Sequence, residues 1–199
     1  MRGSTVQKFM PIPGATDDSR AVRTRDALAS ALIALMHEKG FDDISVQEIC
    51  ERAQVGRSTF YAHFQDRDEL FIRHTVVFGR TLGERLTWDE ARGSYCFPVR
   101  WLFAHVRQMK PVFDSLTRAR KTSFIMKVWQ NNIAEVFVQR VAAVRRAGAT
   151  AVTVPAAALA EQLAGTLVTL MVWWMDHHYP LAEHEMERHF QHLIAGIGR

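Results

Sequence analysis

Residues 53–64 read AQVGRSTFYAHF. Two phenylalanines, Phe60 and Phe64, stand among an arginine, two hydroxyl groups, a tyrosine and a histidine, all of which commonly contact phosphates. A core helix would not carry these polar groups, and a fully solvated helix would not need the two phenyl rings. The composition therefore predicts a short helix with one buried face and one face available to a partner.

A helical arrangement of residues 57–64, at about 100° per residue, separates the two kinds of side chain. Phe60 and Phe64 fall on one side, whereas Ser58 and Ala62 lie roughly opposite. Small side chains at the outward centre would let the backbone approach the floor of a DNA major groove. Longer side chains that could reach phosphates on either wall lie on the two flanks: Arg57, Thr59, Tyr61 and His63.

The flanking sequence completes a helix-turn-helix pattern. Ser45 and Glu48 form a capping box that predicts a short helix over residues 46–53. A three-residue connection leads to the helix described above, and Asp66 marks the start of a longer one. Another helix is expected from about residue 20 to 39. Two short helices joined by a tight turn and braced by longer helices are typical of DNA-binding proteins.

The stretch from Arg25 to Phe71 resembles the N-terminal domain of the TetR family of transcriptional repressors. The positions that carry the resemblance are Gly40-Phe41, Ile44-Ser45-Val46, Ile49, Ala53-Gln54-Val55, Thr59-Phe60-Tyr61, His63-Phe64 and Arg67-Asp68-Glu69-Leu70. In that family the first helices form the DNA-binding domain, and the remaining helices form a variable domain for ligand binding and dimerisation. The resemblance covers about fifty residues and is far more specific than a helix-turn-helix pattern alone.

Three positions depart from the usual family pattern. Gln54 stands in place of a glycine in the turn, Gly56 in place of a serine cap, and Ser58 where glycine is common. Glycine is an acceptable N-cap, and glutamine in a left-handed turn costs on the order of 1 kcal/mol. The first two changes leave the resemblance intact, whereas Ser58 bears on which bases are read.

By position, the resemblance implies that Arg57 and Ser58 face base edges. The residues that it implies at phosphates are Thr59, Tyr61, His63 and Arg67, with Ser45 and Arg25 from the preceding helices. Alternatives stay open at two of these positions. Tyr61 could pack on the first helix, and Arg67 could be a solvated cation instead of a phosphate ligand that relieves its unfavourable place at a helix start.

Net charge does not by itself indicate nucleic-acid binding. The 199-residue chain has a formal charge of +4, but residues 1–74 carry 10 Lys and Arg against 11 Asp and Glu, or −1. Any contact with DNA therefore depends on where individual arginines lie rather than on a general positive field.

The chain is expected to be all-α, with about nine helices, because no convincing run of alternating polar and apolar residues occurs. We expect a flexible arm at residues 1–18, a three-helix helix-turn-helix domain at 19–66, and a helical ligand-binding and dimerisation domain at 67–199. A loop is expected around residues 92–94. Helices at about 156–177 and 181–194 are apolar on broad faces, and the resemblance implies that they pair with their twins in a homodimer on a palindromic operator.

A pocket for a small apolar or aromatic effector is expected within the C-terminal domain. Its candidate lining is Trp101, His105, Met109, Phe113, Met126, Trp129 and Trp173. Aromatic and methionine side chains at helical spacing are also the ordinary content of a protein core, so this alternative stays open.

Other classes of protein fit the sequence less well. The strongly apolar run at residues 163–175 is short for a membrane span, no signal peptide is recognised, and two cysteines do not make a disulfide framework, so we expect a cytoplasmic protein. Neither a cofactor nor an enzymatic activity is expected. Two alternatives remain: a co-regulator that acts through protein contacts, and a small metalloenzyme using residues such as Glu185, His189 and His192.

Overall fold

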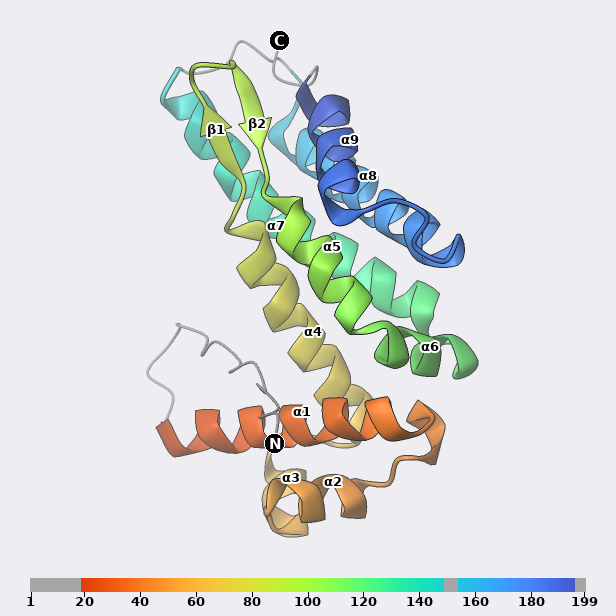
Figure 1. Ribbon diagram of the computed structural model, residues 1–199. Coiled ribbons are helices and arrows are strands. Elements are labelled where there is room, and N and C mark those ends of the chain that lie inside the picture. Colours follow the sequence, from red (N-terminus) through yellow and green to blue (C-terminus); the bar gives the residue numbers. More distant parts are fainter. Residues whose placement is uncertain (1–18, 149–153, 196–199) are drawn as a thin grey trace, which may run out of the picture.

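The computed structural model describes residues 19–148 and 154–195, and these residues fold almost entirely into helices (Figure 1). Within these ranges there are nine α-helices, one short 3-10 helix and one two-stranded hairpin. The prediction of an all-α fold is confirmed. The arm predicted at residues 1–18 lies outside the described residues.

The N-terminal elements form a compact group below the other helices in Figure 1. They are α1 (Ser19–Glu38), the 3-10 helix η1 (Phe41–Asp43), α2 (Val46–Ala53) and α3 (Arg57–His63). The bounds predicted for α2 agree with the structure, and α3 ends one residue earlier than expected. Contacts of α1 with α2, and of α2 with α3, hold the group together.

Local capping explains where these helices begin and end. The Ser45 side chain accepts a hydrogen bond from the Glu48 backbone N–H, and the Glu48 carboxylate accepts one from Ser45 N at 2.9 Å. Gln54 ends α2 in the left-handed conformation, with φ of 55°. Gly56 is the N-cap of α3, and the Asp66 carboxylate caps α4 (Arg67–Gly83) by accepting from Glu69 N at 2.8 Å.

The remaining helices pack around the long α7. They are α5 (Val99–Gln108), α6 (Lys110–Arg118), α7 (Thr122–Arg146), α8 (Ala156–Asp176) and α9 (Glu183–Ala195). Helix α7 packs against both α4 and α8, while α5 packs against α9. Helix α6 lies beside α1 and η1, which places it at the junction between the two groups of helices (Figure 1).

A hairpin occupies the segment where a loop was predicted. Strands β1 (Thr87–Asp89) and β2 (Ser94–Cys96) pair antiparallel, with Trp88 opposite Tyr95. The two rings meet edge to face at 5.0 Å. Strands of three residues are too short to show a period-two pattern, which is why the sequence did not indicate them.

Two glycines on α4 allow a close approach to α7. A Cβ added at Gly79 would lie 3.3 Å from Asn132 Cβ, and one added at Gly83 would lie 2.7 Å from Val136 Cβ. The second distance is well inside van der Waals contact, so the two backbones are close at the end of α4 that is remote from α1.

Helix α8 supplies much of the core of the C-terminal group. By length and composition alone it could cross a membrane, and it is the one such helix among the described residues. Its buried residues include Leu163, Leu167 and Trp174, and it packs along α7. Packing of this kind is typical of a core helix in a globular protein.

Candidate nucleic-acid interface

Helix α3 has the two faces that its sequence predicts. Phe60 is fully buried and Phe64 is 3% exposed, and their rings lie 5.8 Å apart. The residues on the opposite side and on the flanks are exposed: Arg57, Ser58, Thr59, Tyr61 and Ala62. His63, also on a flank, is partly buried. The predicted separation of aromatic anchors from polar side chains is therefore present.

Tyr61 points away from the core of the N-terminal group. Its side chain is 52% exposed, and the edge of its ring contacts Phe60 at 5.4 Å. About half of the Tyr61 surface is therefore open to a partner, which favours the interface role over the alternative of packing on α1.

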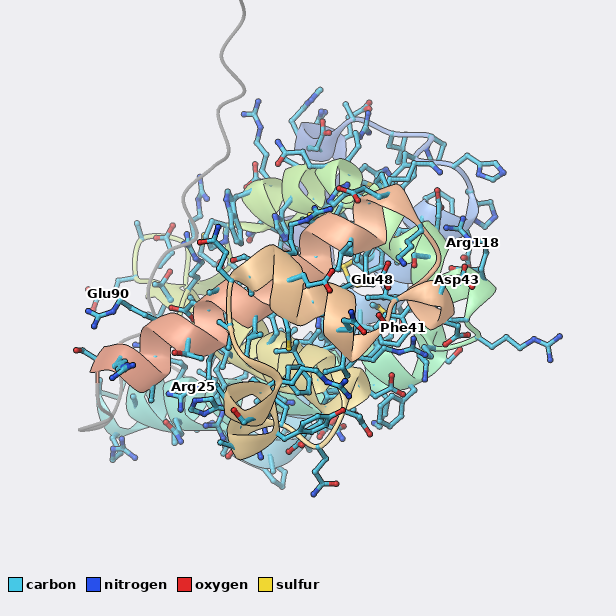
Figure 2. The ribbon with its side chains drawn as sticks, turned by 90° about the horizontal axis from the view of Figure 1, so that it is seen from below. Arg25, Phe41, Asp43, Glu48, Glu90 and Arg118 are labelled. Carbon is cyan, nitrogen blue, oxygen red and sulfur yellow. The ribbon has the colours of Figure 1, made fainter. Side chains whose placement is uncertain are left out.

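Two arginines lie on this side of the molecule. Arg57, at the first position of α3, is exposed and forms no hydrogen bond or ion pair with the part of the chain that the structure describes. Arg25 is partly buried on α1 and is labelled in Figure 2, which views the N-terminal helices from below. Burial raises the pKa of the neighbouring Asp26, and the Arg25 charge opposes that increase.

Ser45 forms the capping box that its sequence predicts. Its hydroxyl donates to the Glu48 carboxylate at 2.8 Å and accepts from the Glu48 N–H at 3.2 Å. A serine hydroxyl has one proton to donate, and this proton already serves the capping box. Ser45 is therefore a helix cap in the chain without DNA, and its contact with a phosphate stays a prediction.

Arg67 has several partners within the chain. Its guanidinium donates to the backbone oxygens of Asp42 at 2.8 Å and Ile44 at 2.5 Å, and to the Asp42 carboxylate at 3.2 Å. It also lies 4.9 Å above the centre of the Phe41 ring. These internal partners account for a cation at the start of α4, and a contact of Arg67 with a phosphate stays a prediction.

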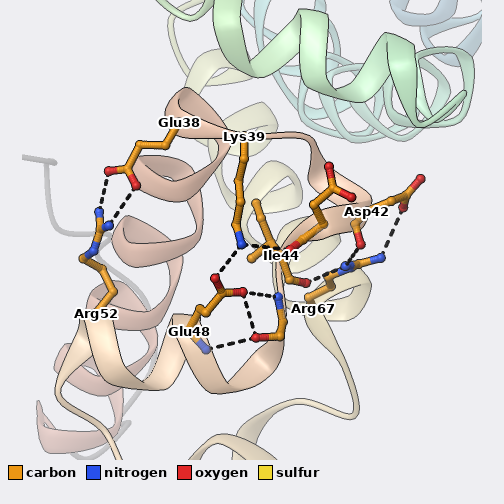
Figure 3. A network of polar contacts seen from close by, with 9 residues as sticks. Glu38, Lys39, Asp42, Ile44, Glu48, Arg52 and Arg67 are labelled. Carbon is orange, nitrogen blue, oxygen red and sulfur yellow. Dashed lines mark hydrogen bonds and ion pairs between the residues drawn. The ribbon is translucent and has the colours of Figure 1, made fainter.

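Ion pairs within the N-terminal group use several of its other charges (Figure 3). Arg52 forms two hydrogen bonds with Glu38, each of 2.9 Å, and Lys39 contacts Glu48 at 2.5 Å. The Lys39 and Ser45 hydrogen bonds hold the pKa of Glu48 at about 2. Neutralisation inside the domain leaves Arg57 as the exposed cation on α3.

A cluster of stacked rings lies between α4, α5 and α7, and we call it the aromatic cluster: Phe78, Trp101, His105 and Trp129. Phe78 lies at its centre, 5.9 Å from Trp101, 5.0 Å from His105 and 5.1 Å from Trp129. Trp101 and His105 stack with only 11° between their planes. The Trp129 indole N–H is buried with no hydrogen-bond partner among the described residues.

The structure brings together most, but not all, of the residues predicted to line a pocket. Trp101, His105 and Trp129 belong to the aromatic cluster, and Phe113 meets Trp129 edge to face at 6.1 Å. Met109 and Met126 pack in the same core. Trp173 differs, because it is 41% exposed on α8 and stacks on His177. The central Phe78 was missed, since one more phenylalanine on an amphipathic helix carries no special signal.

Two histidines in or beside this cluster are kept neutral. Burial, with a smaller contribution from His105, lowers the pKa of His74 to about 4. Burial also lowers the pKa of His105 below its ordinary value. At neutral pH both rings are therefore uncharged and can offer one donor and one acceptor nitrogen each.

The alternative metal site receives no support from geometry. Glu185, His189 and His192 lie on α9, and the Glu185 carboxylate accepts a hydrogen bond from Ala182 N at 2.8 Å. In the described ranges, no three histidine, cysteine or acidic side chains are grouped closely enough to hold a metal ion.

The N-terminal helices match a known family. Residues 28–73 match the model of the bacterial regulatory proteins of the tetR family. A stretch of 54 residues is 37% identical to an uncharacterized HTH-type transcriptional regulator, YxbF, of Bacillus subtilis (strain 168). That stretch is 27% of this chain and 14% of the length of the relative.

Two solved structures share the fold over most of the chain. A TetR-family transcriptional regulator of Syntrophomonas wolfei is 16% identical, with a TM-score of 0.62 over 85% of this chain and 92% of that one. RolR, solved in complex with resorcinol, is 18% identical, with a TM-score of 0.55 over 88% of this chain and 89% of its own. At these identities the likeness concerns the fold.

Fold and interface together define an all-α protein with an N-terminal helix-turn-helix domain. Its second short helix presents a polar face above two buried phenyl rings. Residues 28–73 of this domain are similar to the bacterial regulatory proteins of the tetR family.

Proposed function

We propose that this chain is a cytoplasmic, DNA-binding transcriptional repressor and not an enzyme. The observation that carries the proposal is α3, where Phe60 is buried while Arg57, Ser58, Thr59 and Tyr61 are exposed on the other sides. We place the DNA-binding domain at residues 19–66 and the effector and dimerisation domain at 67–199.

Roles follow from the positions of the exposed side chains. Arg57 and Ser58, at the start of α3, are suited to base edges, because the first turn of a recognition helix enters the major groove. The side chains assigned to phosphates are Thr59, Tyr61, His63 and, from α1, Arg25. Their hydroxyl and nitrogen donors fit phosphate oxygens without requiring a particular base.

A homodimer would give two copies of α3 for a palindromic operator. Helices α8 and α9 carry the exposed apolar side chains Trp173 and Leu193, which are 41% and 45% exposed in the single chain. Burying these faces against a second copy would remove apolar surface from water. Repressors of this type read half-sites about 34–36 Å apart, one turn of the double helix.

The aromatic cluster is the place where we propose that an effector binds and releases the protein from DNA. His74 and His105 are neutral near pH 7, and charging His74 there would work against a pKa of about 4. An anionic ligand therefore finds no ready positive partner in these rings, so an uncharged aromatic compound fits better. RolR, whose fold is similar, was solved with the uncharged aromatic compound resorcinol.

Binding to the chain's own upstream DNA tests the proposal. Arg57→Ala is expected to weaken binding by about 1–3 kcal/mol and to relax the preference at one base position. Tyr61→Phe is expected to weaken binding about equally on all sequences, because it loses a phosphate contact. Arg118→Ala at the end of α6 removes the same charge away from α3 and serves as the control.

The co-regulator alternative rests on the near-neutral charge of residues 1–74. It predicts that wild-type protein gives no sequence-specific shift of its upstream DNA at moderate salt, and that Arg57→Ala changes nothing. Either result would remove the repressor proposal, provided that circular dichroism shows both proteins folded.

A further inference from the structure

Helix α6 makes a polar contact with the N-terminal domain, and the residue before α7 makes one with the first turn of α4, which directly follows that domain. Lys121, directly before α7, donates to the Asp68 carboxylate at the start of α4, with an Nζ–Oδ2 distance of 2.6 Å. Ser115, which is fully buried on α6, donates to the backbone oxygen of Lys39 at 3.4 Å. Both contacts join segments that are far apart in sequence.

From Asp68 the contacts continue toward η1. Arg67 Nε lies 3.7 Å from Asp68 Oδ1, and the same guanidinium holds the backbone oxygens of Asp42 and Ile44. The Arg67 guanidinium and the Lys121 ammonium also lie over the buried Phe41 ring, at 4.9 Å and 5.4 Å from its centre. Two cations from different helices thus share one carboxylate and one aromatic ring.

Both routes end at the first turn of α2 (Figure 3). Ile44, held by Arg67, immediately precedes the N-cap Ser45. Lys39, held through its backbone by Ser115, donates its ammonium group to the Asp43 oxygen at 2.8 Å and to the capping-box carboxylate of Glu48 at 2.5 Å. The start of α2 is therefore fixed from the C-terminal domain, and α3 follows α2 after a short turn.

We propose that Lys121 and Asp68 are positioning residues that set the orientation of α2 and α3 relative to the C-terminal domain. A displacement of α6 or α7 would break this ion pair and change how α3 is presented. The proposal rests on the proposed function, because it assigns the route by which an event in the C-terminal domain alters DNA binding.

The pair differs from an ordinary surface ion pair, which contributes little. The Lys121 and Asp68 side chains are 30% and 40% exposed, and the other carboxylate oxygen of Asp68 is buried without a hydrogen bond. Removing Lys121 would leave a partly buried carboxylate with the weaker, longer contact to Arg67. Rearrangement of Arg67 and η1 is the expected response.

Four variants test the proposal: Lys121→Gln, Asp68→Asn, the charge reversal Lys121→Asp with Asp68→Lys, and the control Lys110→Gln. Lys110 pairs with Asp114 within α6 at 2.5 Å, so its variant removes the same charge without breaking a contact between domains. Affinity for the upstream DNA is measured by fluorescence anisotropy, and exchange of the backbone amides of residues 41–48 is measured by mass spectrometry.

We expect Lys121→Gln and Asp68→Asn each to weaken DNA binding about five-fold or more, in the range of typical coupling between sites. If the two side chains acted on DNA directly through their charge, the two variants would change the DNA affinity in opposite directions, because one removes a positive and the other a negative charge. We expect faster amide exchange at residues 41–48 in both variants, partial recovery in the charge reversal, and no change in Lys110→Gln.

Unchanged exchange in Lys121→Gln and Asp68→Asn, or opposite effects of the two on DNA affinity, would overturn the proposal. The exchange measurement needs no DNA, so it stands even if wild-type protein binds none of its upstream sequence. Failure of the wild-type protein to bind its upstream DNA would contradict the proposed function. Unaltered amide exchange in the two variants would contradict only the positioning role.

Discussion

Gln54 occupies a backbone conformation that side chains with a Cβ seldom adopt. Its φ of 55° ends α2 in the left-handed region, and its N–H bonds back to the Cys50 and Glu51 oxygens. Gln54→Gly is expected to raise the free energy of unfolding by up to about 1 kcal/mol, because glycine has no Cβ clash there.

Chemical denaturation of both proteins measures this difference. Gln47→Gly, within α2, is the matched control, and it is expected to lower the free energy of unfolding by about 1 kcal/mol. Equal destabilisation by the two variants would contradict the role assigned to the left-handed turn.

His74 makes the stability of the fold depend on pH. Its pKa falls from an ordinary 6.5 to about 4 in the folded protein, so below pH 6.5 the unfolded chain binds a proton that the folded protein does not. The free energy of unfolding is therefore expected to decrease by roughly 3 kcal/mol as pH falls from 6.5 toward 4, and to be retained above 6.5. His105 acts in the same direction.

Denaturation curves recorded between pH 7 and 4.5 test this expectation. His74→Gln should make the pH dependence clearly flatter, whereas His37→Gln, at the exposed end of α1, should leave it unchanged. Parallel curves for wild type and His74→Gln would show that His74 does not titrate as described.

At the scale of single residues, local sequence patterns correctly predicted the features that depend only on residues nearby in the sequence. The buried side of α3 and the caps at Ser45 and Asp66 depend on residues within one or two turns, so periodicity and capping rules were sufficient. The contact of Arg67 with Asp42 was not predicted, because the two residues are 25 positions apart. Nothing in the local sequence indicates that contact.

Among the elements, the packing of α4 on α7 depends on Gly83. An alanine there would place its Cβ 2.7 Å from Val136 Cβ and 3.1 Å from Val136 Cγ1. Overpacking costs about 1–3 kcal/mol, while the better helix propensity of alanine returns about 1 kcal/mol. Gly83→Ala is therefore expected to be destabilising by up to about 2 kcal/mol.

Thermal unfolding of Gly83→Ala measures the effect. Adding Val136→Ala removes only the 3.1 Å contact with Cγ1 and leaves the 2.7 Å contact between the two Cβ atoms, so the double variant should stay destabilised. Gly79→Ala is the milder comparison, because its added Cβ would lie 3.3 Å from Asn132 Cβ. If Gly83→Ala were more stable than the wild type, α4 and α7 could move apart without loss of stability, which would contradict the role assigned to Gly83.

Helices with strong caps were easier to predict than the connection between α4 and α5. The hairpin of β1 and β2 depends on pairing across a turn and on packing of β2 against α9. Tyr95 is buried there, but a single tyrosine in a polar segment does not indicate burial. Tertiary contacts decide this element.

For the whole molecule, the charge distribution predicts a weak dependence of DNA binding on salt. Arg25 and Arg57 are the two arginines assigned to the interface, so a dimer would bring about four cations to the operator, where each displaces counterions from the DNA. The slope of log affinity against log salt is then expected to be about −4. Anisotropy titrations between 50 and 200 mM salt, concentrations over which such slopes are resolved, measure it. A slope near −10 would require cations that this interface does not include.

The close approach of α4 to α7 at Gly83 gives α4 the geometry of a lever. Gly83 holds one end, Phe78 lies about 7.5 Å along the helix, and Arg67 lies about 24 Å along it, at 1.5 Å per residue. If α4 stays straight, a sideways shift of about 1 Å at Phe78 becomes roughly 3 Å at Arg67. A small rearrangement among stacked rings would thus be magnified threefold where the helix meets η1.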